Sequence, residues 1–288
     1  MRGIKPSKIT TRCGDTLEED WPYFDDSDPS ETYEPIYADA VVSNPPYSQS
    51  WDPTDKESNP RYAEYGVAPK GKADYAFLLH DLYHVRSEGI MTIVLPHGEL
   101  FRGGDEGKIR RNLIEKNKID TIIGLPANIF FGTGIPTIIM ILKQMRDNND
   151  VLIIDASKGF VKDGKNNKLR ASDIKRIVDT VSARISVPKF SKVVSRDEIR
   201  QNDYNLNIPR YVDSSESAET WDIYASMFGG IPVNEVDSLA EYWNAFPNLR
   251  AELFKTSDTP YLQLACDDIK SAICNNNDVI KYEQAYEQ

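Results

Sequence analysis

The stretch from Ala38 to Tyr47 constrains the fold of this chain more than any other. An apolar run with two adjacent valines stops at Asn44, and two prolines and an aromatic residue follow it. β-branched residues favour a buried central strand, and Pro45-Pro46 ends any strand because neither proline has an N–H to donate. Asn44 and Tyr47 are therefore expected at the carboxyl end of a strand, where ligands bind in open α/β sheets. We interpret this stretch as a candidate active site.

Strand and helix patterns alternate along most of the chain and indicate an α/β fold, a mostly parallel sheet with helices on both faces. Gly89 is expected to end the first helix and Ser172 to cap the last, while Arg110 is expected on the outer face of the second. The expected helices cover residues 72–88, 105–117 and 172–184, and the expected strands cover 90–95, 119–124, 137–143 and 151–155, after a short strand within 4–11.

Two segments without periodicity separate these elements. Residues 48–71 are expected to be a long loop that is either functional or mobile, and because they leave directly from the candidate site, a role in covering the substrate is one interpretation. Residues 202–211 are polar, and we expect them to be extended and to end the main domain. This predicts one domain over 1–213 and a helical region over 214–288 that contacts another subunit.

Charge is unevenly distributed along the 288 residues, whose net charge is −11. Residues 158–200 contain twelve basic and five acidic residues, whereas residues 213–288 contain four basic and fourteen acidic ones. These runs are either ordinary solvated faces, or a basic middle that faces phosphates between acidic ends that face solvent or a protein. The negative net charge of the whole chain disfavours binding of nucleic acid by bulk electrostatics. The absence of an apolar span or signal-peptide core favours the cytoplasm.

The three cysteines, Cys13, Cys266 and Cys274, have no metal-ligand spacing and are expected to be free thiols. No metal site is predicted from the sequence.

Methyl transfer to the exocyclic amine of adenine would give the tetrad Asn44-Pro45-Pro46-Tyr47 a chemical role. The lone pair of that nitrogen is delocalised into the purine, so it is a poor nucleophile. The side-chain oxygen of Asn44 and the carbonyl of Pro45 can accept both N6 hydrogens and free the lone pair for attack on a sulfonium methyl. Tyr47 offers a flat face for an extruded base, worth ~1–3 kcal/mol. In the alternative interpretation the stretch has only a structural role: Asn44 caps a loop, and the Tyr47 ring packs against the rest of the protein.

Several further motifs occur in order along the chain. They are Gly14-Asp15-Thr16-Leu17, Ser43-Asn44-Pro45-Pro46-Tyr47-Ser48, Lys72-Ala73-Asp74-Tyr75-Ala76-Phe77, Leu95-Pro96-His97-Gly98 with Leu100-Phe101-Arg102-Gly103-Gly104, Leu125-Pro126 with Phe130 to Thr137, and Asn202 to Tyr211. Together they resemble the modification (methyltransferase) subunit of type I restriction–modification systems, in the N6-adenine DNA methyltransferase family. The resemblance is strong over about residues 1–213 and weaker beyond.

The resemblance implies a class I S-adenosylmethionine-dependent methyltransferase fold (Rossmann-like), with S-adenosylmethionine as donor and adenine N6 in DNA as acceptor. Asp15, with Thr16, would match the residues near the cofactor, and Asn44, Pro45, Pro46 and Tyr47 would match the target-base pocket. Phe130 or Phe131 would stack on the other face of the base, unless both are core packing. His97 is expected to fix a loop rather than to act chemically.

One departure from the family pattern is informative. A strand that ends in a glycine-rich turn should precede all these motifs, and Gly103-Gly104 and Gly132-Thr133-Gly134 lie too late to serve. An amino-terminally truncated fragment is therefore expected, without the first two strands of the sheet and with hydrophobic edges left unpaired. We expect such a fragment to be nearly inactive alone and to bind the donor poorly.

The partners implied are DNA, the specificity and restriction subunits of a type I complex, and a separate chain that supplies the missing amino-terminal part. Two alternatives stay open. One is a non-catalytic assembly module that docks a specificity subunit, and the other is an N-methyltransferase that acts on RNA or protein.

Overall fold

A computed structural model of the chain describes residues 5, 8–9, 11, 13–18, 35–130, 134–215, 222–256 and 259–286. The chain divides into two compact units, Met1–Ser215 and Glu216–Gln288. The strand expected within residues 4–11 lies mostly outside the described residues, as does Phe131. Among the described residues, no helix has the length and apolarity that a membrane span requires.

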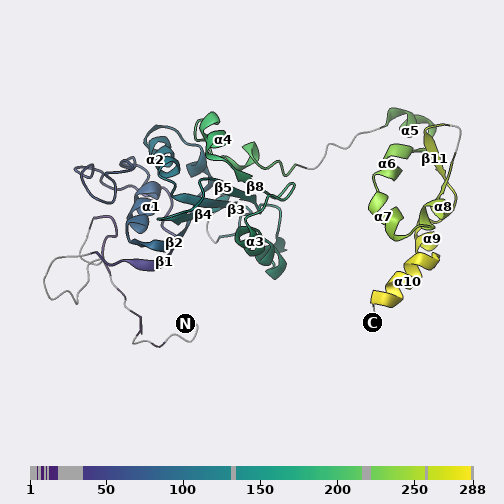
Figure 1. The fold of residues 1–288 in the computed structure, drawn as a ribbon, viewed down its shortest axis with the longest axis horizontal. Helices are drawn as coiled ribbons and strands as arrows, with labels where there is room; N and C mark the ends of the chain where they lie inside the picture. Colours follow the sequence, from purple (N-terminus) through teal and green to yellow (C-terminus); the bar gives the residue numbers. More distant parts are fainter. Residues whose placement is uncertain are drawn as a thin grey trace. The chain divides into compact units, whose positions relative to one another are not determined.

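The first unit is built on a six-stranded sheet with the order β1-β2-β4-β3-β5-β8 (Figure 1). The strands are β1 (Ala38–Ser43), β2 (Val85–Pro96), β3 (Ile119–Gly124), β4 (Thr137–Lys143), β5 (Val151–Asp155) and β8 (Ser191–Val194). β1 pairs with β2 and β3 with β5 in parallel, while β4 is antiparallel to both neighbours and β8 is antiparallel to β5. The sheet is therefore mixed rather than mostly parallel. The described residues between β3 and β4, 125–130 and 134–136, contain no helix, and a parallel crossover usually contains one.

Helices lie on both faces of this sheet, as expected (Figure 1). They are α1 (Asp74–Tyr83), α2 (Gly104–Glu115), α3 (Ala171–Ala183) and α4 (Arg196–Gln201), with 3₁₀ turns η3 (His97–Leu100) and η4 (Ile208–Arg210). α1 and α2 pack on one face in the larger core cluster, which includes Leu79, Met91 and Ile109. α3 packs on the opposite face, where Ile177 joins a smaller cluster with Leu152. Each buried side chain of this kind contributes about 1.5–3 kcal/mol.

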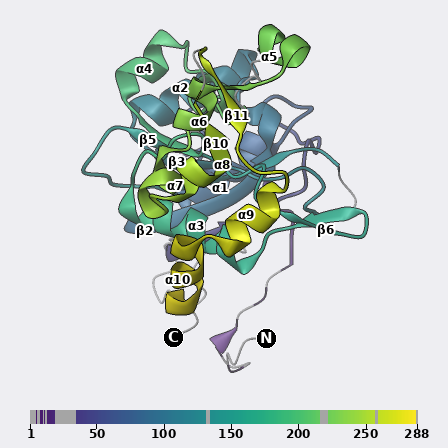
Figure 2. The same ribbon diagram turned by 90° about the vertical axis from the view of Figure 1, so that its right-hand side faces the viewer.

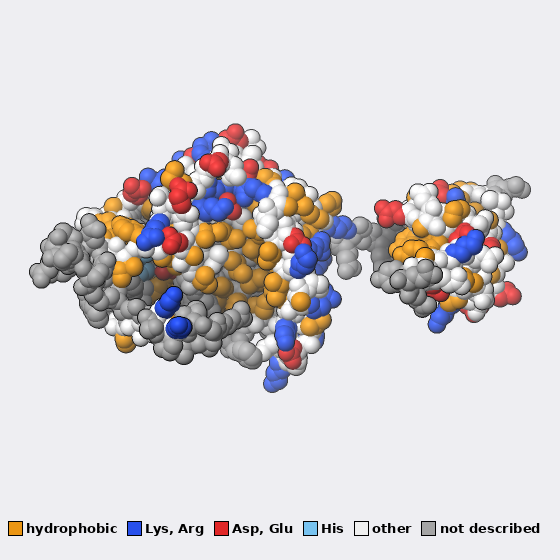
Figure 3. Space-filling model, turned by 60° about the horizontal axis from the view of Figure 1, so that its bottom comes forward, with side chains coloured by type: hydrophobic (Ala, Val, Ile, Leu, Met, Phe, Trp, Pro, Cys, Tyr) orange, Lys and Arg blue, Asp and Glu red, His pale blue; other side chains and the backbone are white. Residues whose placement is uncertain are grey.

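β1 occupies the edge of the sheet, and the prediction that it is a buried central strand is wrong. Its described pairing is with β2 alone. The side chain of Val42 is 86% exposed. On β2, the side chain of Ile90, which pairs with Ala40, is 39% exposed. Figure 3, which brings the lower side of the molecule forward, shows hydrophobic side chains gathered on this face of the first unit. Among the described residues, only the half of the face under β3 and β5 is covered by a helix, namely α3.

Gly89 lies inside β2 and does not end the preceding helix. α1 ends at Tyr83, and β2 begins only two residues later. A Cβ on Gly89 would lie 2.7 Å from Cγ1 of Val85 and 3.0 Å from the carbonyl oxygen of Asp39. The glycine is thus required where β1 approaches β2 at a shift in register, not where a helix ends.

Both segments expected to be irregular are packed into the core. Residues 48–71 form turns and irregular loop, as expected, and Trp51, Tyr62 and Tyr65 anchor the segment in the larger cluster, while its role in covering a substrate stays a prediction. Residues 202–211 are not extended: they form turns that lead into η4 and bury Leu206 and Ile208. Large apolar side chains at irregular spacing supplied the burial that periodicity could not reveal.

Two side-chain roles also differ from expectation. Arg110 is buried, and its guanidinium donates to the carbonyl oxygens of Glu99, Arg102 and Tyr204 at 3.1, 2.9 and 2.7 Å. α3 is capped by the Asp173 carboxylate, which accepts the N–H of the preceding Arg170 at 2.9 Å, and not by Ser172. Backbone acceptors therefore explain why Arg110 is buried, and the Asp173 carboxylate explains how α3 is capped.

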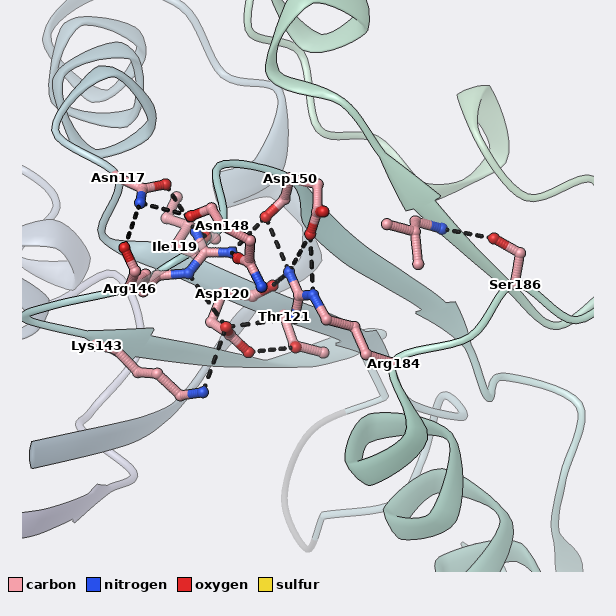
Figure 4. A network of polar contacts seen from close by, with 11 residues as sticks. Asn117, Ile119, Asp120, Thr121, Lys143, Arg146, Asn148, Asp150, Arg184 and Ser186 are labelled. Carbon is pink, nitrogen blue, oxygen red and sulfur yellow. Dashed lines mark hydrogen bonds and ion pairs between the residues drawn. The ribbon is translucent and has the colours of Figure 1, made fainter.

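A buried ion-pair network ties the far end of the sheet together (Figure 4). Asp120 on β3 accepts from Arg146 at 3.2 Å and from Arg184, just after α3, at 3.3 Å, and it lies 3.4 Å from Lys143 on β4. Arg184 also pairs with Asp150 before β5 at 2.5 Å. The network therefore joins three strands and a helix at the edge opposite the candidate site.

A short hairpin of β6 (Val161–Asp163) and β7 (Asn166–Lys168) extends from the first unit (Figure 2). Its turn contains Gly164 at φ +62°.

The second unit contains short helices around a small sheet of order β10-β11-β9. Its elements are α5 (Ile223–Phe228), β9 (Ile231–Pro232), α6 (Val233–Asp237), α7 (Ala240–Ala245), α8 (Leu249–Leu253), β10 (Phe254–Lys255), β11 (Tyr261–Leu264), α9 (Ile269–Asn275) and α10 (Asn277–Tyr286). The described core of this unit is small and includes Val236, Leu249, Leu253 and Leu262. The three short strands were not predicted from the sequence.

Candidate functional site

β1 brings the Asn44–Tyr47 loop to the carboxyl edge of the sheet. Asn44 follows the last residue of the strand and is exposed, while Pro45 is buried and anchors the loop. The hydroxyl of Tyr47 donates to Oδ1 of Asn44 at 3.0 Å. The two polar side chains predicted to act together therefore meet directly.

Asp74, the first residue of α1, holds this loop from behind. The N–H of Ser48, which directly follows Tyr47, lies 3.1 Å from each carboxylate oxygen of Asp74. Ser48 has a left-handed backbone, with φ +51°, so the turn depends on this contact. Burial raises the pKa of Asp74 despite the hydrogen bond from Ser48. Burial, and then the charge of Asp74, raises the pKa of the Tyr47 hydroxyl.

A cluster of buried acids continues from Asp74. Glu99, in η3, is fully buried and pairs with Arg102, which also lies 3.6 Å from Oε1 of Glu106 on α2. Burial, and then the carboxylates of Glu106 and Asp74, raises the pKa of Glu99 to about 8. Arg102 thus faces the carboxyl groups of Glu99 and Glu106, and the raised pKa of Glu99 favours its protonated form. Neither Glu99 nor Asp74 was predicted from the sequence to be a site residue, although Glu99 follows a strand end closely.

The Gly14–Leu17 turn is fixed by its own carboxylate and by the 48–71 segment. Oδ1 of Asp15 accepts the N–H groups of Leu17 and Glu18 at 3.0 and 3.3 Å. The guanidinium of Arg61 donates to the carbonyl oxygens of Thr16 and Leu17 at 3.5 and 3.3 Å. Among the described residues, no hydrogen bond or ion pair joins this turn to the Asn44–Tyr47 loop.

The remaining predicted residues lie elsewhere on the same edge. Phe130 is half-buried and packs against the smaller core cluster, and its partner Phe131 lies outside the described residues. The backbone of His97 donates to the carbonyl of Pro136 at 3.1 Å, and its ring meets that of Phe101 edge-on at 5.6 Å. Burial lowers the pKa of His97. These contacts join the loops that follow β2 and precede β4.

The described residues lack the glycine-rich turn expected of a donor site. In the described ranges, no strand runs through a glycine-rich turn directly into a helix. Gly103 and Gly104 precede α2, but they follow η3 rather than a strand. Asp15 keeps one carboxylate oxygen free of its own turn bonds, which is one contact of the several that a nucleoside cofactor needs.

The mixed sheet with helices on both faces, and with a polar loop at the carboxyl end of an edge strand, is a fold of class I methyltransferases. It superposes on the crystal structure of the type I restriction enzyme EcoKI M protein with a TM-score of 0.53, at 19% identity over 85% of this chain and 53% of that one. At this level of identity the likeness establishes the fold, and the predicted fold class is confirmed.

Residues 1–220 match the family model described as N-6 DNA Methylase, and the chain belongs to this family. It is 44% identical over 191 residues to the type I restriction enzyme MpnII methylase subunit of Mycoplasma pneumoniae, covering 64% of this chain and 35% of that protein. It is 51% identical to a type I restriction–modification methyltransferase subunit from Streptococcus thermophilus, whose crystal structure superposes with a TM-score of 0.64 over 69% of this chain and 41% of that one.

The chain therefore spans about a third of the first relative and two fifths of the second. The resemblance inferred from the ordered motifs is confirmed.

Proposed function

We propose that this chain supplies the acceptor pocket of a methyltransferase that modifies N6 of adenine in DNA within a type I restriction–modification complex. The observation that carries the proposal is the Asn44–Tyr47 loop, held at the carboxyl end of β1 by Asp74. Family membership supports DNA as the substrate.

In this proposal the loop binds and orients the exocyclic amine. Oδ1 of Asn44 and the carbonyl oxygen of Pro45 accept the two N6 hydrogens, which draws the nitrogen toward tetrahedral geometry and frees its lone pair. Oδ1 of Asn44 has two lone pairs, so it can keep the hydrogen bond from the Tyr47 hydroxyl while it accepts one from the amine. The Tyr47 ring stacks on the extruded base, and Phe130 or Phe131 meets its other face.

S-adenosylmethionine supplies an electrophilic methyl group when bound, and Asp15 and Thr16 would contribute to holding it. Since the described residues form only part of a donor pocket, we propose that the chain alone binds this donor poorly. Calorimetric titration of the chain with S-adenosylmethionine should give no clean micromolar isotherm. A clean one would show that the donor pocket is complete.

The acceptor role is tested by Asn44→Ala in a complex reconstituted with a chain that carries the amino-terminal region of the relatives and with a specificity subunit. We expect methylation of duplex DNA to fall by at least two orders of magnitude while assembly is unchanged. Asn149→Ala, an exposed amide away from the loop, is the matched control. Unchanged methylation in Asn44→Ala would refute the proposal and favour an assembly module. Transfer to RNA or protein alone would refute DNA as the substrate.

We propose in addition that the second unit contacts the specificity subunit. α5 exposes four large apolar side chains, Ile223, Tyr224, Met227 and Phe228, on a helix of six residues. Co-purification with a specificity subunit should be lost in Met227→Asp/Phe228→Asp and kept in Asn44→Ala. The restriction subunit would join through that complex.

A further inference from the structure

A cavity of about 590 Å³ lies between α2 and the segment that follows α4. Its walls include the glycines at the start of α2, one exposed aromatic ring, three side-chain amides and four cations. The lining residues that matter are Gly103, Gly107, Phe101, Gln201, Asn202, Asn205, Lys108, Arg110, Arg111 and Arg210. The cavity meets the candidate site at Phe101, whose ring contacts that of His97, and it does not include the Asn44–Tyr47 loop.

The charge of this cavity is positive in a chain whose net charge is −11. Asp203 is the one acidic residue of the lining. Lys108 is paired with Asp105 at 3.0 Å, but among the described residues Arg110, Arg111 and Arg210 form no ion pair with a carboxylate. Arg111 and Arg210 are exposed. The Arg110 guanidinium is occupied by three backbone carbonyl oxygens, so Arg111 and Arg210 are the guanidinium groups of the lining that are available to bind an anion.

The wall of the cavity is held in an unfavourable backbone conformation. Asp203 and Tyr204 are consecutive left-handed residues, at φ +53° and +56°, and each such residue costs on the order of 1 kcal/mol. The Tyr204 carbonyl accepts from Arg110 at 2.7 Å, and its hydroxyl donates to Glu115 at 2.6 Å. The guanidinium of Arg111 lies over the Tyr204 ring at 5.2 Å. Strain of this kind, fixed by surrounding contacts, is concentrated at functional sites in proteins.

The cavity borders the sheet edge that carries the candidate site. The N–H of Leu206 donates to the carbonyl of Leu100 at 2.9 Å, so this segment is bonded to the turn that follows β2. Ile208 in η4 lies against Gly124 at the carboxyl end of β3. A ligand in the cavity would therefore lie on the same side of the sheet as the Asn44–Tyr47 loop.

We propose that this cavity binds the phosphodiester backbone of DNA and that it thereby orients the duplex beside the acceptor loop. The proposal rests on the proposed function for the identity of the nucleic acid. Arginines, side-chain amides and backbone N–H groups are the usual partners of phosphate oxygens, and they carry no base specificity. The exposed Phe101 ring adds an apolar contact for a sugar at the rim.

The test is the salt dependence of DNA binding by the full chain, measured by fluorescence anisotropy with a labelled duplex. Each phosphate contact contributes about 0.9 to the slope of log Kd against log salt concentration. In Arg111→Gln/Arg210→Gln we expect that slope to fall by about 2. Because both side chains are exposed, the thermal unfolding midpoint should be unchanged. Arg86→Gln/Lys175→Gln removes the same charge from other surfaces and is the matched control.

Equal slopes in Arg111→Gln/Arg210→Gln, in the control variant and in the wild type would overturn the proposal. Absence of any duplex binding by the wild type at low salt, or binding confined to RNA, would overturn it too. These outcomes are independent of the methylation assay. A failure of Asn44→Ala to reduce methylation would refute the acceptor role and leave the slopes unaffected.

Discussion

Asp74 controls the candidate site although it does not face the substrate position. Both of its carboxylate oxygens lie within hydrogen-bond distance of one backbone N–H, that of Ser48. Without an acceptor, this N–H would be left partly buried and unsatisfied, which costs about 1–3 kcal/mol. The geometry of Asn44 and Tyr47 therefore depends on a side chain 26 residues away from Ser48.

Asp74→Ala should release the loop and reduce the free energy of unfolding by about 1–3 kcal/mol. The local effect should appear as faster hydrogen exchange at the Ser48 amide, whereas Asp74→Asn should retain an acceptor and exchange more slowly than the alanine variant. Asp105→Ala removes an exposed carboxylate and should change stability by less than about 0.5 kcal/mol. Identical Ser48 exchange in all three variants would show that Asp74 does not hold the loop.

Glu99 should give the first unit a characteristic dependence on pH. Its pKa is raised to about 8 in the folded state, from the ordinary value of 4.5 for a glutamate. Between these values the folded state holds a proton that the unfolded state has lost, so stability should decrease as pH rises from about 5 to 8. Arg102 faces the same group, but burial, Glu106 and Asp74 outweigh it.

Glu99→Gln removes this titration while it keeps the shape of the side chain. The difference in thermal unfolding midpoint between variant and wild type should shift in favour of the variant as pH is raised from 5.5 to 8.5. A constant difference across this range would show that Glu99 is ionised in the folded protein.

Strand pairing at the edge of the sheet depends on close backbone approach. β1 and β2 meet with a shift in register, and Gly89 fills a position where no Cβ has room. Gly89→Ala should therefore destabilise the first unit by about 1–3 kcal/mol in urea unfolding. Gly71→Ala has nothing within 4 Å of its added Cβ and serves as the control, with a change near zero or slightly stabilising. Equal effects of the two substitutions would exclude a steric role for Gly89.

The amino end of β3, in the middle of the sheet, depends on charge rather than on close approach. Asp120 and the side chain of Arg146 are both nearly fully buried, and removing one partner leaves the other charge uncompensated. Asp120→Ala should cost about 3–5 kcal/mol in urea unfolding, whereas Lys175→Ala, in an exposed pair with Asp179, should cost less than about 0.5 kcal/mol. A cost below 1 kcal/mol for Asp120→Ala would show that the network adds little.

At the scale of the molecule, local pattern predicted the elements better than it predicted their neighbours. The apolar runs of β3, β4 and β5 and the periodicity of α2 could be read directly, and the ordered motifs indicated the family. The direction of β4 could not be read, because it depends on how β3 and β4 connect. The position of β1 at an edge could not be read either, because a valine pair has the same appearance in a central strand.

The candidate site divides in the same way. The sequence placed Asn44 and Tyr47 together correctly, since they are adjacent in a rigid loop. It did not reveal Asp74 or Glu99 as parts of the site, because each reaches it through tertiary contacts. It also placed Arg110 outside, because helical periodicity carries no information about backbone acceptors in a segment 94 residues away.

The open flank of β1 has a consequence for handling the protein in solution. Among the described residues β1 pairs with β2 alone and Val42 is exposed, and an edge strand of this kind is a template on which other chains can add. Sedimentation velocity should show a weight-average mass that rises with protein concentration. Val42→Lys should suppress that rise, whereas Val161→Lys, on an exposed hairpin, should not. The self-association of this chain would then measure directly how accessible the β1 edge of its sheet is.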